Sequence, residues 1–489
     1  MGEGRTKIVA TVGPACGSAA LIERMIQAGV DVFRLNFSHG EHDQHAAYVK
    51  MIREAADELE TPVAIMQDLQ GPRIRTGPLQ GGKSVDLERG HQVVIESGDF
   101  AGTADRISTG YNYLAQDVST GDAILINDGL IELEVSEVGE SWVRCEVLEG
   151  GKLQEHQGMN LPGVDLSISA PTEKDLSDLA FAFEHELDYV ALSFVRSATD
   201  LSRLQQEMDN YDAAPIPIVA KVERPEAVDE LGEILKLAGG VMVARGDLGI
   251  EMPTEKVPGV QKRIIRAANE AAVPVITATQ MLESMIENRR PTRAEASDVA
   301  NAILDGTDAV MLSGETAIGQ YPLESVRVME RIGRQTELDA PERPHRSGEG
   351  CEAMTRQQAL ASAARGVAER LNAEGIIAFT MTGATARYVS QQRPDNMIFA
   401  LTPEKATYRR LALVWGVRPV MFPLFGSTDE MIERGEARLL DAGLASVGDT
   451  LVCMAGASTS TPGGTDMLKI HPFDGTNPYV EGDETSTGC

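Results

Sequence analysis

Three side chains capable of chemistry stand close together where two apolar segments end. Lys221 and Glu223 close the segment 217–222, and Asp247 follows the segment 240–244. Residues two apart on a strand point to the same side, so Lys221 and Glu223 are expected to share one face. Carboxylate oxygens suit Mg²⁺ or Mn²⁺, and a lysine ammonium can stabilise negative charge on a phosphoryl group in flight.

Polar groups also end four further apolar segments. They are Arg34, Asn36 and Ser38 after one segment, Asp68 after a second, Thr279 after a third and Ser313 after a fourth. An ion pair at one strand end is usually structural, whereas six ends that gather cations, carboxylates and hydroxyls favour an active site. Metal-assisted phosphoryl transfer fits these residue types best, and a barrel lyase of the aldolase type is the alternative.

The elements that must position these groups are eight short apolar segments, most of them followed by a helical pattern. They span residues 8–12, 32–37, 63–69, 189–195, 217–222, 240–244, 275–279 and 309–312. Continuous apolar strands separated by helices are typical of a parallel sheet buried on both faces. Eight of them predict a (β/α)₈ TIM barrel, whose active site lies at the carboxyl ends of the strands.

Two further domains are expected. Between the third and fourth strands, Ile131, Leu133 and Val135 alternate with polar residues after the turn signal at 127–129, which predicts an inserted β domain. After a polar connection at 341–350, strands at 376–380, 397–401, 419–422 and 450–454 alternate with helices, which predicts a doubly wound α/β domain. The predicted limits are 1–70 with 170–340 for the barrel, 71–169 for the insertion and 350–489 for the last domain.

One motif is rejected. Residues 77–84 match the phosphate-binding pattern GxxxxGK[ST], which works only between a strand and a helix. The residues that follow alternate like a strand, so we interpret the match as a turn of the β domain.

Composition excludes several classes of protein. A net charge of −30 disfavours nucleic-acid binding. The sequence contains no run of about 18 apolar residues, so no membrane span is predicted. The start of the chain lacks the apolar core of a signal peptide. Five scattered cysteines without a CxxC spacing favour a reducing cytoplasm.

Several strings resemble the pyruvate kinase family. They include RLNFSHG at 34–40, GPRIRTG at 71–77, ARGDLG at 244–249, ATQMLESM at 278–285 and MLSGET at 311–316. The resemblance implies a barrel with an inserted β-barrel lid and a C-terminal α/β effector-type domain. It implies Mg²⁺-dependent phosphoryl transfer from phosphoenolpyruvate to ADP, giving pyruvate and ATP in the last step of glycolysis. It also implies a homotetramer.

The resemblance further implies roles for single residues. Catalytic roles fall to Lys221, Arg34, Thr279 and Ser313, and phosphoenolpyruvate binding to Arg34, Lys221, Gly246, Asp247 and Thr279. Nucleotide binding falls to Arg75 and His39, metal binding to Glu223 and Asp247, and a sugar-phosphate activator to Thr380, Thr382 and Thr385. A different-class rival, a catalytically silent metabolite sensor, is disfavoured because Lys221, Glu223, Asp247 and Thr279 are intact.

The chain departs from the family pattern at two places. Potassium-requiring members read Asp-Thr-Lys-Gly-Pro-Glu where this chain reads DLQGPR at 68–73, so Arg73 replaces a glutamate. Asn36, Ser38 and Asp68 of the monovalent-cation site remain, and we expect activity without K⁺ because the guanidinium supplies the charge. Many members of the family carry a lysine in the lid at the position where this chain has Gln157. The replacement puts a direct contact between the lid and the nucleotide in doubt.

Overall fold

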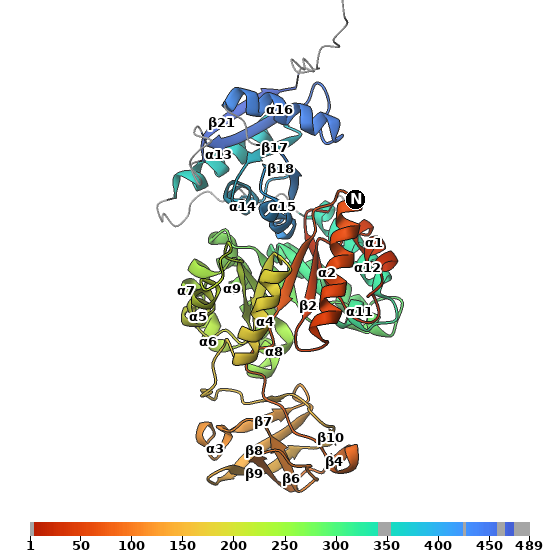
Figure 1. Cartoon of the computed structure of the whole chain (residues 1–489), viewed down its shortest axis with the longest axis vertical. Coiled ribbons are helices and arrows are strands. Elements are labelled where there is room, and N and C mark those ends of the chain that lie inside the picture. Colours follow the sequence, from red (N-terminus) through yellow and green to blue (C-terminus); the bar gives the residue numbers. More distant parts are fainter. Residues whose placement is uncertain (1–3, 341–353, 424–426, 457–464, 474–489) are drawn as a thin grey trace, which may run out of the picture.

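The computed structural model describes residues 4–340, 354–423, 427–456 and 465–473, so the connection predicted at 341–350 lies outside the described residues. Figure 1 shows three parts stacked along the longest axis, with a β domain at one end, a barrel in the middle and an α/β domain at the other end. No helix among the described residues is long and apolar enough to cross a membrane.

Eight parallel strands close the middle part into a barrel, in the order β1-β16-β15-β14-β13-β12-β3-β2. Their bounds are β1 (Lys7–Thr11), β2 (Val32–Asn36), β3 (Ala64–Asp68), β12 (Tyr189–Leu192), β13 (Ile218–Val222), β14 (Gly240–Ala244), β15 (Val275–Ala278) and β16 (Ala309–Leu312). The predicted (β/α)₈ barrel is confirmed. Ser38 lies just beyond β2, because the chain turns after Asn36.

Helices cover the outside of the barrel. They are α1 (Ala19–Gln27), α2 (His42–Glu58), α4 (Glu173–Glu184), α5 (Ala198–Met208), α6 (Pro225–Asp229), α7 (Leu231–Leu237), α8 (Arg245–Glu251), α9 (Val257–Glu270), α10 (Arg293–Asp305), α11 (Gly314–Ala317) and α12 (Pro322–Asp339). Capping boxes begin α4, α5 and α10, and in α4 and α10 the side chains of Thr172 and Thr292 accept hydrogen bonds from backbone N–H groups.

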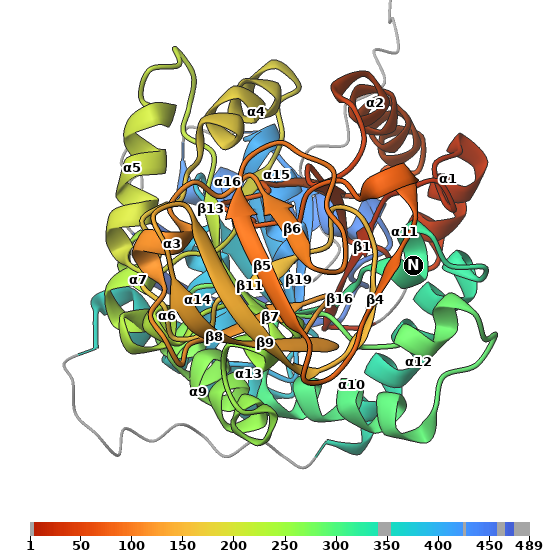
Figure 2. The same ribbon diagram turned by 90° about the horizontal axis from the view of Figure 1, so that it is seen from below.

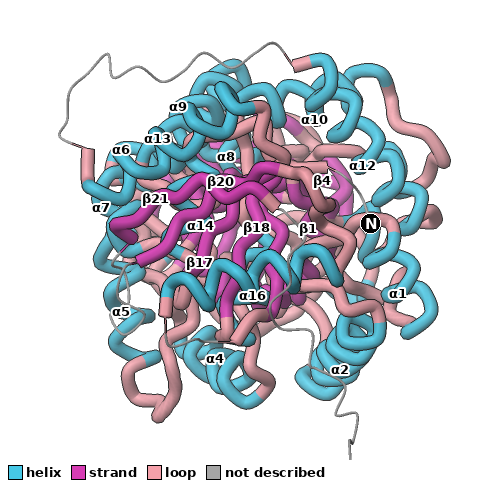
Figure 3. The backbone as a smooth tube through the Cα atoms, turned by 90° about the horizontal axis from the view of Figure 1, so that it is seen from above, coloured by secondary structure: helices cyan, strands magenta, loops and turns pink. Residues whose placement is uncertain are grey.

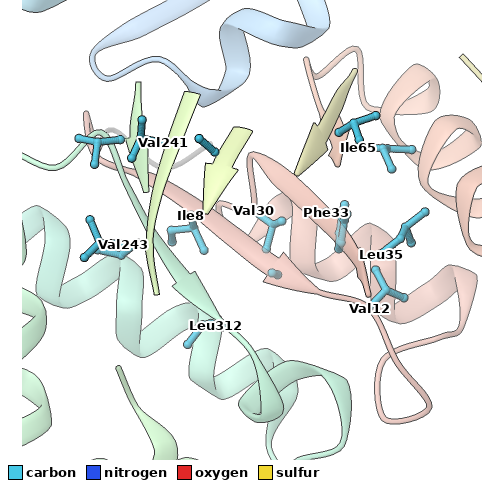
Figure 4. Packing of buried hydrophobic residues seen from close by; sticks show 14 of the residues in the cluster. Ile8, Val12, Val30, Phe33, Leu35, Ile65, Val241, Val243 and Leu312 are labelled. Carbon is cyan, nitrogen blue, oxygen red and sulfur yellow. The ribbon is translucent and has the colours of Figure 1, made fainter. Parts of the chain in front are cut away.

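Alternate strand residues face opposite sides of the barrel wall. Ile8, Phe33 and Val243 pack between strands and helices (Figure 4), whereas Val9, Val32 and Met242 fill the barrel interior. Because both faces are buried, the strands need the continuous apolar sequences from which they were predicted.

The insertion between β3 and β12 lies in front of the barrel when the molecule is seen from below (Figure 2). The predicted β-barrel consists of a six-stranded sheet, β11-β7-β8-β9-β5-β6, and a two-stranded sheet, β10-β4. The strands are β4 (Val85–Leu87), β5 (Gln92–Ser97), β6 (Arg106–Thr109), β7 (Ala123–Ile126), β8 (Ile131–Val138), β9 (Trp142–Glu149), β10 (Gly151–Leu153) and β11 (Met159–Asn160), with one short helix α3 (Leu114–Asp117).

Both local predictions in the insertion hold. Asn127, Asp128 and Gly129 adopt φ values of 57°, 55° and 84° and join β7 to its antiparallel neighbour β8. The rejected phosphate-loop string forms a short turn, η1 (Gln80–Gly82), and strand β4 follows it instead of a long helix.

The last domain holds a five-stranded sheet in the order β19-β18-β17-β20-β21, with helices on both sides (Figure 3). Its elements are α13 (Arg356–Leu371), β17 (Gly375–Phe379), α14 (Ala384–Gln391), β18 (Met397–Thr402), α15 (Lys405–Arg410), η4 (Leu411–Leu413), β19 (Val417–Met421), α16 (Thr428–Asp441), β20 (Thr450–Gly456) and β21 (Thr465–Pro472). Strand β21 was not predicted, because this antiparallel edge strand is half exposed and lacks a continuous apolar run.

The last domain closes the amino-terminal end of the barrel. Ala412 and Leu413 of η4 belong to the same buried cluster as Val9 and Val32 of the barrel interior. A buried ion pair joins the two parts, with Arg393 Nη1 2.9 Å from Asp308 Oδ1.

The Arg393–Asp308 pair is expected to carry much of this junction's stability. Arg393→Met would leave Asp308 buried without a cation and lower the free energy of unfolding by about 3–5 kcal/mol. Urea unfolding followed by circular dichroism measures the loss, and Arg370→Met on exposed α13 surface is the matched control. Equal unfolding midpoints for the two variants would contradict the assignment.

Candidate active site

A continuous network of charges occupies the carboxyl-terminal mouth of the barrel. Arg34 Nε lies 2.5 Å from Asp68 Oδ2, and Lys221 Nζ lies 3.2 Å from Asp68 Oδ1 and 2.8 Å from Glu223 Oε1. These four residues come from β2, β3 and the end of β13, so the barrel joins groups that are distant in sequence. Asp68, Lys221 and Glu223 are buried.

Burial and mutual charge set the protonation of this network. Burial alone would raise the pKa of Asp68, but Arg34 and Lys221 together lower it. Burial alone would lower the pKa of Lys221, but Asp68 and Glu223 raise it, so the ammonium stays charged. Burial raises the pKa of Glu223 to about 7 and the nearby charge of Asp247 adds to that effect, while Lys221 opposes it.

Ser193 also contacts Lys221, and it was not identified as a site residue from the sequence. Its Oγ accepts a hydrogen bond from Lys221 Nζ at 2.6 Å and donates to the backbone oxygen of Leu69 at 2.7 Å. The sequence held a signal, because Ser193 follows Leu192, the last residue of β12, as a polar residue within an apolar run. The predicted strand 189–195 ran past it and hid this strand end.

Gly246, Asp247 and Thr279 lie side by side at the next two strand ends. Gly246 N donates to Thr279 Oγ1 at 2.8 Å, and Asp247 sits in the first turn of α8. Thr279 adopts φ 64°, which is costly for a β-branched residue. Arg245 donates to the Thr279 backbone oxygen at 2.7 Å and pairs with Asp298 at 2.6 Å, and these contacts hold the unusual conformation.

Glu223 and Asp247 fit a divalent cation that keeps other ligands. Among the described residues no group of three or more His, Cys, Asp or Glu side chains could hold a metal by itself. Two carboxylates suit Mg²⁺, which retains water and binds substrate oxygens. Burial first, and the nearby charge of Asp247 second, raise the pKa of Glu223, and a bound cation would favour its charged form.

Ser313 presents a hydroxyl with no partner. Its Oγ is buried and makes no hydrogen bond in the structure, while its backbone N donates to Glu315 Oε2 at 2.7 Å. The backbone contact fixes the turn between β16 and α11 and leaves the hydroxyl available for another partner.

A second cluster of cations lies at the junction of barrel and insertion. Arg73, Arg75 and His156 line a cavity of about 610 Å³ there. Partial desolvation, and then the charges of Arg75, Arg73 and Arg34, lower the pKa of His39. Cations held this close together favour an anion. The Gln157 side chain accepts from Gln154 N at 3.1 Å, inside the insertion.

Among the described residues, no hydrogen bond or ion pair joins Arg73 to Asn36, Ser38 or Asp68 of the monovalent-cation site. Ser38 N donates to Asn36 Oδ1 at 3.2 Å, and Asp68 binds Arg34 and Lys221. Arg73 is exposed and extends beside Gly158 of the insertion.

The predicted effector loop joins β17 to α14, as expected. Thr380 Oγ1 accepts from Gly383 N at 2.9 Å, and buried Thr385 shares a 2.7 Å hydrogen bond with the hydroxyl of Thr465. Thr382 is the exposed member of the three. Two of the three hydroxyls therefore hold the loop in shape.

Comparisons with known proteins agree with this geometry. Two family models match, "Pyruvate kinase, barrel domain" over residues 3–326 and "Pyruvate kinase, alpha/beta domain" over residues 358–471. A pyruvate kinase of Corynebacterium glutamicum is 46% identical over 96% of this chain and 97% of its own length. One of Staphylococcus aureus is 43% identical over 99% of this chain and 82% of its own length.

A solved structure agrees as well. A pyruvate kinase from Cryptosporidium parvum superposes with a TM-score of 0.88 at 36% identity, covering 96% of both chains. Relatives of this similarity over nearly the whole length, together with both domain matches, leave a barrel lyase and a silent sensor unfavoured. The chain therefore belongs to the pyruvate kinase family of phosphotransferases, which transfer a phosphoryl group between phosphoenolpyruvate and ADP.

Proposed function

We propose that the buried network of Arg34, Asp68, Lys221 and Glu223 is the machinery with which this chain moves the phosphoryl group from phosphoenolpyruvate to ADP. The observation that carries the proposal is Lys221 itself, buried yet held as a cation between Asp68 and Glu223. A coupled assay of pyruvate formation from phosphoenolpyruvate, with and without ADP, tests it. Pyruvate formation that does not depend on ADP would favour a lyase.

In this proposal Lys221 faces the phosphoryl group in transfer. A fixed ammonium in a water-poor mouth stabilises the charge that builds up in the transition state, since little reorganisation is needed. Arg34, held by Asp68 and by Thr11 Oγ1 at 3.1 Å, binds the substrate phosphate from the side. Gly246, Asp247 and Thr279 bind the carboxylate of phosphoenolpyruvate.

Glu223 and Asp247 hold the divalent cation in this scheme. Bound there, Mg²⁺ or Mn²⁺ would neutralise phosphate charge and orient the reacting oxygens. Ser313 passes a proton to the enol carbon, through water, to give pyruvate in this scheme. Its buried hydroxyl, which has no hydrogen-bond partner among the described residues, supports this role.

Arg75 and His39 bind the phosphates of the nucleotide at the junction with the inserted domain, which acts as a lid that excludes water when it closes. The cluster of positive charge around His39 supports this role. Gln157 contributes structure to the lid instead of a nucleotide contact, because its side chain is engaged with Gln154.

Other features of the proposal follow from the family. They are a sugar-phosphate activator at the loop of Thr380, Thr382 and Thr385, a homotetramer, a cytoplasmic location and the domain limits given above. The free, buried Cys16, Cys145 and Cys453 support a reducing compartment.

Loss of the metal carboxylate is expected to abolish turnover. Asp247→Ala leaves one carboxylate for Mg²⁺, which holds that ion poorly. Activity at saturating Mg²⁺ and Mn²⁺ binding by electron paramagnetic resonance are measured together, and exposed Asp229→Ala is the control. Near-normal activity in Asp247→Ala would sink the assignment.

Removal of the lysine charge is expected to act on catalysis more than on binding. Lys221→Met should lower kcat by roughly 10²–10³-fold, with a much smaller change in KM, because the ammonium stabilises the transition state. Steady-state kinetics with both substrates give the two constants, and exposed Lys50→Met is the control. An effect confined to KM would refute the transition-state role.

Activity is expected without potassium. Arg73 supplies a permanent positive charge at the position that is glutamate in potassium-requiring members, and its exposed side chain reaches the cavity at the lid junction. Activity is measured in buffer free of Na⁺ and K⁺ at constant ionic strength and titrated with KCl. Arg73→Glu should create a potassium requirement, whereas Arg89→Glu on exposed lid surface should not.

Saturable, many-fold activation of the unaltered enzyme by KCl would contradict this prediction. It would mean that Arg73 remains beside Gly158 during turnover and leaves the cation site open.

A further inference from the structure

A second cavity lies between the amino-terminal end of the barrel and the last domain. Its volume is about 400 Å³, within the range of roughly 300–1,000 Å³ that holds small molecules. The barrel contributes the start of β12 and the turn before β15, and the last domain contributes α14, α15 and η4. Figure 1 shows α14 and α15 on the side of their domain that faces the barrel.

The lining of this cavity is positive, although the chain as a whole carries a net charge of −30. Lys236, Arg387 and Arg410 line it, and none of the lining residues is acidic. Lys236 is neutralised by Glu233 at 2.6 Å. The two arginines remain as the charges that the protein does not balance locally.

Neither arginine forms an ion pair with any residue that the structure describes. Arg387 Nη1 reaches the backbone oxygen of Thr382 at 3.4 Å, and Arg410 Nη2 reaches that of Pro215 at 3.5 Å, both at the long limit for hydrogen bonds. Arg410 Nε is buried and has no partner. Buried donors without acceptors are costly, so a ligand that accepts from them is favoured.

Arg387 and Arg410 line the same cavity, together with Tyr189. Burial raises the pKa of Tyr189; the charges of Arg387 and Arg410 oppose that rise, whereas those of Asp188 and Asp308 add to it. Asp188 and Asp308 are already paired with Arg53 and Arg393. The Tyr189 hydroxyl donates to the Arg410 backbone oxygen at 2.8 Å and fixes the end of α15 against β12. The two cations therefore belong to one cavity, and neither is bound to a carboxylate that the structure describes.

We propose that this cavity binds a small phosphate ester, with its phosphate between Arg387 and Arg410 and its sugar or nucleoside part against the turn before β15. Planar guanidinium groups match phosphate oxygens in pairs, and two of them balance a dianion. The occupant bridges barrel and last domain and so stabilises their junction. This site faces the barrel and is distinct from the effector loop, with which it shares only the exposed Thr382.

The test is calorimetric titration of the full chain with AMP, with ribose 5-phosphate and with inorganic phosphate. At least one ester should bind more tightly than inorganic phosphate and raise the melting temperature. Arg387→Gln and Arg410→Gln should each weaken that binding by roughly tenfold or more, since a hydrogen bond to a charged group is lost. Arg387→Lys keeps the charge without the paired donors and should give an intermediate affinity.

Two control variants locate the ligand. Exposed Arg370→Gln removes the same charge from the same domain, and Thr385→Val alters the effector loop. Arg370→Gln should retain all binding, and Thr385→Val should retain the binding event that Arg387→Gln and Arg410→Gln weaken. The proposal is overturned if no ester binds at millimolar concentration, if Arg387→Gln and Arg410→Gln bind as tightly as the unaltered chain, or if only Thr385→Val loses the ligand. Equal affinity for succinate would overturn the phosphate class.

Discussion

Everything at the mouth of the barrel depends on keeping a lysine charged where water is scarce. Moving an ammonium out of water is expensive, and the protein offsets that cost with Asp68 and Glu223, which lie 3.2 Å and 2.8 Å from Lys221 Nζ. Asp68 also holds Arg34, so one buried carboxylate orients both cations. The barrel provides these contacts because it brings the ends of β2, β3 and β13 together.

The two ends of the barrel differ in structure, because one is open and the other is closed by the last domain. The carboxyl-terminal end stays open toward the lid and carries unsatisfied or strained groups, such as the Ser313 hydroxyl and the left-handed Thr279. The amino-terminal end is closed by Ala412 and Leu413 and tied by the Arg393–Asp308 pair. The amino-terminal end thus joins two domains, while the proposed site residues lie at the opposite end, as is usual for this type of barrel.

The sequence predicted what periodicity and composition encode. Strands β14 and β16 were predicted at their observed bounds, because buried parallel strands read as continuous apolar runs. Strand β21 was not predicted, because half-exposed edge strands lack that continuous apolar signal. Ser193 escaped because its role depends on a contact with Lys221 across neighbouring strands, and the outward direction of Arg73 depends on the lid. For Ser193 the only local signal is a polar residue within an apolar run, and its contacts, like those of Arg73, are set by the tertiary structure.

The central claim is that Asp68 keeps both cations in position for phosphoryl transfer. Its most direct test is kcat for pyruvate formation by Asp68→Asn, a change that keeps shape but removes the charge. The account predicts a fall of roughly 10–10³-fold in a variant that circular dichroism shows to be folded at the assay temperature, although its melting temperature falls because two buried cations lose their shared carboxylate. An unchanged kcat would contradict it, because Lys221 and Arg34 would then be shown to work without their shared carboxylate.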